Sequence, residues 1–190
     1  APPYLVPLYE GTSVREAELL APTAYADGDR LPVTLTGPRW AEVDLFIRQT
    51  ARFTIASPSA RRAFRNSILA GFARGPYTTG ALLAYLNSTP VRWYHFFRQR
   101  DAQQGMPQVK IGHLRALPAP DAAALERLDR LGSELAARNR GLTGAERSAL
   151  DAIVAEALGV RGPALARVLA WGRDHPPPAP RGPARAGPVR

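Results

Sequence analysis

The first half of the chain alternates short apolar runs with turn residues, a pattern that is typical of β-strands. Its clearest run covers residues 43–56, where β-branched and aromatic side chains predict strand structure that ends at Ser57-Pro58. Further extended segments are expected at 4–9 and 32–36. The run at 66–72 fits either a strand or a helix, because periodicity does not separate the two over so few residues.

The second half changes to the helical period. Thr78 or Thr79 caps a first helix, and Thr89-Pro90 starts a second one that carries an aromatic stripe. Leucines with three- and four-residue spacing predict a longer amphipathic helix beyond Asp121, and two shorter helices follow it. We therefore expect an α+β fold, in which a small mixed or mainly antiparallel sheet with packed helices is followed by a helical C-terminal segment.

The 190 residues divide into three parts, and 45 % of them are apolar, which is enough to bury a core. Residues 1–120 hold the sheet and the first helices. Residues 121–174 form a helical segment that is expected to pack on the first part, on a partner or on a second copy. Residues 175–190 are rich in proline and arginine and present no packable face, so we expect them to be disordered.

The net charge of +9 is concentrated in the middle of the chain and in the tail. Residues 39–120 contain twelve basic residues against three acidic ones, and no acid occurs between Asp44 and Asp101. Arginine outnumbers lysine by 24 to 1, which the base composition of the gene would explain, but that composition does not explain the missing acids. Because a basic surface attracts polyanions, the charge pattern predicts a nucleic-acid partner.

Several classes of chemistry are excluded by what the sequence lacks. There is no cysteine, so disulfides and cysteine-based zinc sites are ruled out. The three histidines lack metal-ligand spacing, and no phosphate-binding glycine motif or nucleophile elbow occurs. We therefore predict no metal site, no cofactor and no catalytic centre in this chain. Apolar stretches are short and no secretory signal is seen, so no membrane association and a cytoplasmic location are expected.

Five segments, in this order and spacing, resemble the TaqI-like C-terminal specificity domain, the target-recognition part of adenine-specific DNA methyltransferases and fused type II restriction–modification enzymes. The resemblance covers residues 4–120. Thr12 stands where the family carries a basic residue. The segments are Pro7-Leu8-Tyr9-Glu10-Gly11, Phe46-Ile47-Arg48-Gln49-Thr50, Asn66-Ser67-Ile68, 82–88 and 106–120.

The resemblance implies that residues 1–120 are a DNA target recognition domain that is non-catalytic by itself. Its partners would be double-stranded DNA and a methyltransferase catalytic domain, placed upstream of Ala1 or acting in trans. S-adenosylmethionine would bind to that catalytic domain. An alternative of another class is a protein-interaction module of a phage-defence or restriction complex, in which the helices bind the partner.

The residues that contact DNA in such a domain belong to two groups. Arginine and lysine neutralise phosphates, whereas arginine, glutamine, asparagine and histidine reach the edges of bases. Arg48 and Gln49 match the family's strand, and for both residues two roles are considered, a contact with DNA and a buried structural hydrogen bond. Phosphate contacts are predicted for Arg61, Arg62 and Arg65. A polar loop suited to base reading supplies Arg98, Arg100, Gln103, Gln104, Gln108, Lys110 and His113. We expect the arginines between Arg39 and Arg115 to share one surface.

Overall fold

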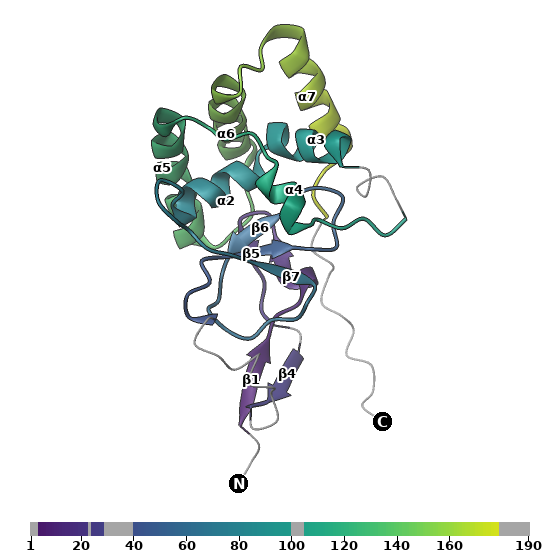
Figure 1. Cartoon of the computed structure of the whole chain (residues 1–190), viewed down its shortest axis with the longest axis vertical. Helices are drawn as coiled ribbons and strands as arrows, with labels where there is room; N and C mark the ends of the chain where they lie inside the picture. Colours follow the sequence, from purple (N-terminus) through teal and green to yellow (C-terminus); the bar gives the residue numbers. More distant parts are fainter. Residues whose placement is uncertain (1–3, 23, 29–39, 100–104, 179–190) are drawn as a thin grey trace.

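The computed structural model describes residues 4–22, 24–28, 40–99 and 105–178. Figure 1 shows an elongated molecule with the helices at one end, a small sheet in the middle and the β1–β4 ribbon at the other end. Helices and antiparallel strands occupy separate regions of the chain, which confirms the predicted α+β class. The expected strand at 32–36 and most of the proline-rich tail lie outside the described residues.

The middle of the molecule is a three-stranded antiparallel sheet in the order β6-β5-β7. The central strand is β5 (Leu45–Arg48), and its partners are β6 (Ala56–Pro58) and β7 (Ile68–Gly71). The first three residues of β5 are buried because helices cover the sheet and Phe46 packs on Phe64 with ring centroids 5.1 Å apart. The ambiguous run at 66–72 is thus a strand over most of its length.

The strand structure predicted over 43–56 is interrupted, because β5 ends at Arg48 and β6 begins only at Ala56. Thr54 is fully buried, and its hydroxyl donates to the carbonyl of Leu86 at 2.6 Å, while the carbonyl of Ile55 accepts from Arg48 N at 3.0 Å. This stretch is therefore held both by the end of a helix and by the last residue of β5. Two smaller antiparallel pairs precede the sheet. They are β1 (Leu5–Leu8) with β4 (Ala24–Asp27), and, after the 3-10 turn η1 (Gly11–Ser13), β2 (Val14–Arg15) with β3 (Glu18–Leu19).

The helices begin where side chains satisfy their first backbone N–H groups. Thr78 accepts from Ala81 N at 3.1 Å, and Ser88 caps the next helix with Pro90 in the first turn. Among the described residues, no helix has both the length and the apolar character needed to cross a membrane. The helices are α2 (Thr79–Asn87), α3 (Thr89–Arg98), α4 (Ile111–Arg115), α5 (Ala122–Arg138), α6 (Gly144–Ala157) and α7 (Gly162–Asp174).

Helices α2 and α5 cross in backbone contact, with one glycine from each at the crossing. A Cβ atom added to Gly132 would lie 1.9 Å from the carbonyl oxygen of Gly80, so no side chain fits there. Beside this crossing, Leu125, Leu128 and Leu135 are buried in the same core as the sheet. The helical segment therefore packs on the first part of its own chain (Figure 1).

A buried ionic network joins the loop between β2 and β3 to helices α3 and α6. Arg92 is 1 % exposed, and its Nη1 donates to Glu16 Oε1 at 2.6 Å. Arg147 donates to both oxygens of the same carboxylate. The guanidinium of Arg92 also lies over the ring of Phe53, 4.7 Å from its centroid. One carboxylate thus holds two cations from different helices against the strand region.

Candidate nucleic-acid interface

The opening segment of the resemblance lies beside the loop that joins β6 to β7. Tyr9 N donates to Ala63 O at 2.9 Å, and Arg65 N donates to Tyr9 O at 2.9 Å. Two residues further on, Gly11 N donates to Ser67 Oγ, also at 2.9 Å. These bonds tie residues 9–11 to 63–67, although more than fifty positions separate the two segments.

The end of strand β5 brings two more segments to the same place. Gln49 N donates to Ser67 O at 3.0 Å, and Gln49 O accepts from Val109 N at 2.7 Å. Four of the five segments that carry the resemblance therefore meet around Gln49 and Ser67. The fifth is attached elsewhere, because the buried amide of Asn87 is bonded to both backbone groups of Ala56 in β6.

Gly11 is required by the closeness of this junction. A Cβ atom at Gly11 would lie 2.7 Å from the carbonyl oxygen of Ser67, a distance at which the backbone would have to move. Close packing against Ser67 thus explains why the opening motif has a glycine at this position.

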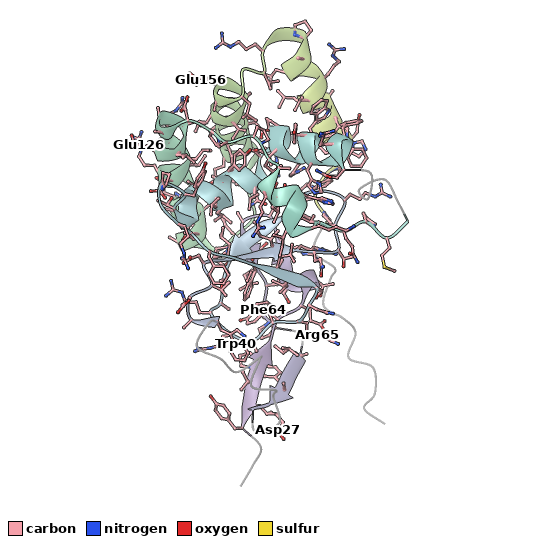
Figure 2. The ribbon with its side chains drawn as sticks, viewed as in Figure 1. Asp27, Trp40, Phe64, Arg65, Glu126 and Glu156 are labelled. Carbon is pink, nitrogen blue, oxygen red and sulfur yellow. The ribbon has the colours of Figure 1, made fainter. Side chains whose placement is uncertain are left out.

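The junction carries an open cavity of about 380 Å³, which we call the polar hollow. Arginine, carboxylate, amide and hydroxyl side chains line it, and no large apolar side chain is among the described residues of its wall. Figure 2 places Arg65 where the β1–β4 ribbon meets the sheet, far from Glu126 and Glu156 on the helical end. The lining residues are Glu10, Gly11, Thr12, Arg48, Thr50, Arg65, Asn66 and Ser67.

The three arginines predicted to bind phosphate are exposed and share the loop between β6 and β7. Arg65 Nη1 lies 2.6 Å from Glu10 Oε1, in an ion pair whose side chains are 59 % and 28 % exposed. Arg61 lies more loosely beside Asp44, with 3.8 Å between nitrogen and oxygen. No ion pair of Arg62 is found within the described ranges. The loop thus presents cations with different degrees of neutralisation.

The strand residues Arg48 and Gln49 are half-buried. Arg48 Nε donates to Thr50 O at 3.1 Å, which folds its guanidinium against the end of its own strand, and the side chain also lines the polar hollow. Gln49 takes part through its backbone, as described above. The side chain of Arg48 thus makes a structural hydrogen bond and also lines the hollow, whereas the bonds of Gln49 described here involve only its backbone.

The polar loop is described only in part. Arg100, Gln103 and Gln104 lie outside the described residues. Arg98 is exposed at the end of α3, and Gln108 is half-buried. Lys110 is exposed at the start of α4, a short helix that the sequence did not indicate, and its backbone N–H donates to Nδ1 of His113 at 3.3 Å.

The expectation that the central arginines share one surface is wrong for Arg92. Its guanidinium is buried between Glu16 and Phe53, because two elements far from it in sequence supply a carboxylate and an aromatic face. Conversely, sequence reasoning did not select Glu10, Thr12, Thr50 or Asn66, all of which line the polar hollow. Glu10, Thr50 and Asn66 belong to the motif segments, so a signal for them was present.

Titratable groups with altered properties lie away from the polar hollow. Burial, together with the neighbouring His113, lowers the pKa of His95 to about 4. Burial also raises the pKa of Asp151, whose carboxylate accepts from Thr89 N at 2.6 Å. Among the described residues, no three histidine or acidic side chains lie close enough together to hold a metal ion.

Comparison with known proteins gives no match, either to a family model or to a curated protein. The polar hollow and its surroundings are therefore the basis for assigning a function.

Proposed function

We propose that this chain is the sequence-specific DNA recognition domain of an adenine DNA methyltransferase or restriction–modification enzyme, and that it is non-catalytic by itself. One observation carries the proposal. Four segments that resemble a TaqI-like specificity domain meet around the polar hollow, and the exposed Arg61 and Arg62 lie in the loop that forms one of its walls. Residues that are distant in sequence thus form one polar, cation-bearing site.

The ion pairs set the arginines of the loop apart from one another. Arg65 pairs with Glu10 at 2.6 Å, whereas Arg61 has a carboxylate only at 3.8 Å and Arg62 has no ion pair among the described residues. Cations that are less neutralised by the protein attract phosphates more strongly, so Arg61 and Arg62 are the better phosphate ligands of the loop. The helical end also carries an exposed arginine without an ion pair within the described ranges, Arg130, so the choice of the loop depends on its place beside the polar hollow.

In this proposal the loop arginines bind phosphates and set the position of the duplex, while groups at the hollow and in the polar loop reach the bases. A methyltransferase catalytic domain, upstream or in trans, binds S-adenosylmethionine and works on an adenine turned out of the helix. The chain's own contribution is to place that domain at one sequence. This division of labour explains why the sequence carries recognisable recognition segments without a catalytic motif.

The test is binding of a fluorescent duplex at several salt concentrations. The wild-type chain is expected to bind with an affinity that falls steeply as salt is added. In the Arg61→Gln, Arg62→Gln double variant, the plot of log K against log salt is expected to be less steep by about 2, since each lost phosphate contact removes about 1 from the steepness. Arg130→Gln with Arg161→Gln is the matched control, because both side chains are exposed on the helical end. A salt-independent affinity, or an equal change in the control, would contradict the proposal.

One observation favours the alternative, a protein-interaction module of a phage-defence or restriction complex. A cavity of about 560 Å³ lies between α3 and the start of α7, and Trp93, Tyr94, Val160 and Val168 contribute to its mainly apolar wall. This function predicts a protein partner that still co-purifies after Arg61, Arg62 and Arg65 are all changed to glutamate. DNA recognition predicts that the same variant loses duplex binding.

A further inference from the structure

We infer that the polar hollow reads a G·C base pair, with Arg65 donating to guanine and Glu10 accepting from the paired cytosine. This inference rests on the proposed function, and it assigns Arg65 a role different from that of its loop neighbours. It starts from the Arg65–Glu10 ion pair, in which Nη1 and Oε1 are 2.6 Å apart at the mouth of the hollow.

The ion pair makes Arg65 a poor phosphate ligand and a good directional donor. A carboxylate at 2.6 Å cancels much of the positive charge that a phosphate would seek. The same carboxylate restrains the guanidinium at Nη1, and the guanidinium carries five N–H donors in a rigid fork. Arg62, exposed in the same loop, has no such carboxylate among the described residues and remains a phosphate ligand in this scheme.

The order of donors and acceptors in the pair matches one base pair in the major groove. A G·C pair presents two acceptors on guanine, N7 and O6, followed by the N4 amino donor of cytosine. Arg65 offers two adjacent donors, and Glu10 offers an acceptor beside them. An A·T pair presents acceptor, donor, acceptor, which places its donor against a guanidinium and its last acceptor against a carboxylate. The arrangement therefore favours G·C over A·T.

Both side chains stand on a backbone that holds them in register. Arg65 N donates to Tyr9 O, one residue before Glu10, and Gly11 N donates to Ser67 Oγ, one residue after it. The backbone groups on either side of the ion pair are thus cross-linked by hydrogen bonds of 2.9 Å. Such a support lets a base-reading pair discriminate without first becoming ordered.

The experiment selects duplexes from a randomised pool with the full chain and sequences those that bind. The wild type is expected to prefer G·C at one position by about 5- to 150-fold, the range for a good bidentate contact. Arg65→Gln is expected to lose that preference while it keeps the others. Glu10→Gln is expected to weaken discrimination at the same position. Arg62→Gln is the matched control, expected to lower affinity for every sequence and to leave all preferences intact.

The outcomes separate this inference from the proposed function. If Arg65→Gln lowers affinity equally for all sequences and keeps every preference, Arg65 is a phosphate ligand and only the inference fails. If Glu10→Gln raises affinity for all sequences, the carboxylate merely repels DNA, and again only the inference fails. A folded wild-type chain that binds no duplex overturns both. Thermal unfolding of each variant verifies folding, and both side chains are exposed enough to change without loss of the core.

Discussion

The strongest stability prediction concerns Glu16, the carboxylate shared by two arginines. Glu16→Gln keeps the shape of the side chain but removes its charge. Arg92, which is 1 % exposed, would then retain its charge in a site without the carboxylate that now accepts from it at 2.6 Å. The change thus removes the ion-pair partner of a buried cation and leaves it the ring of Phe53, the carbonyl of His175 and the charge of Asp151.

The size of the effect follows from the burial. Loss of one partner from a buried ion pair costs about 3–5 kcal/mol, because the remaining charge stays desolvated. Arg147 also loses its bidentate partner, but its side chain is 29 % exposed and recovers part of that loss from water. Since a domain has about 5–15 kcal/mol of stability in total, Glu16→Gln is expected to remove a large share of it.

Urea unfolding followed by circular dichroism measures this loss. With a slope of about 1–3 kcal/mol per molar, the midpoint is expected to fall by at least about 1 M. Glu126→Gln is the control, because Glu126 is exposed on α5 (Figure 2) and its change is expected to shift the midpoint very little. Glu16→Leu combined with Arg92→Met is expected to cost less than the sum of the two single changes, since it removes both charges.

The reasoning is refuted if Glu16→Gln and Glu126→Gln give the same midpoint and the same slope. It is also refuted if the double change and the single changes are simply additive. Either result would mean that the buried guanidinium does not depend on Glu16 for its compensation.

Two further predictions test the packing and the buried histidine. Gly132→Ala is expected to lower the free energy of unfolding in urea by about 3 kcal/mol or more, because its Cβ would meet the Gly80 carbonyl. Gly144→Ala is the control: Gly144 has open space around it, and the free energy of unfolding is expected to stay within about 1 kcal/mol of the wild type. Equal losses in the two variants would contradict the close crossing of α2 and α5. His95 has a pKa of about 4 in the folded chain, against 6.5 ordinarily. As the pH is lowered, the unfolded chain therefore binds the proton first, and the free energy of unfolding is expected to fall by up to about 3 kcal/mol from pH 6.5 to pH 4. His95→Phe is expected to flatten that part of the urea-midpoint profile against pH, and an unchanged profile would contradict the assignment.

Local signals account for most of the secondary structure that the sequence predicted. The starts of α2, α3 and α5 were readable because a cap needs only Thr78, Ser88-Thr89-Pro90 or Asp121 within a few residues of the helix. Helix α4 was missed because five residues give no period to read. The strand prediction at 43–56 was wrong in the middle of the run, where residues 49–55 are not in a strand and Thr54 is bonded to a helix residue thirty-two positions away.

The sequence indicated the segments that form the site, but it indicated neither all of the lining residues nor the pairings between them. The motif segments were recognisable one by one, but nothing in them indicates that Glu10 meets Arg65 across fifty-five positions. The burial of Arg92 has the same origin, since its partner Glu16 is seventy-six positions away. A sum of charge over a segment counts Arg65 and Arg92 alike, although the side chain of Arg65 is exposed and that of Arg92 lies against a buried carboxylate.

The crossing of α2 and α5 has a consequence for engineering. Exchanging the first part of this chain for that of another chain of the same fold by cutting near Pro120 would separate α2 from the helix that touches its backbone, and a substitute helix would fit only if it carried a glycine opposite Gly80. A chimera should therefore move residues 4–178 as one cassette. The junction then avoids the interface in which the two helices share their tightest fit.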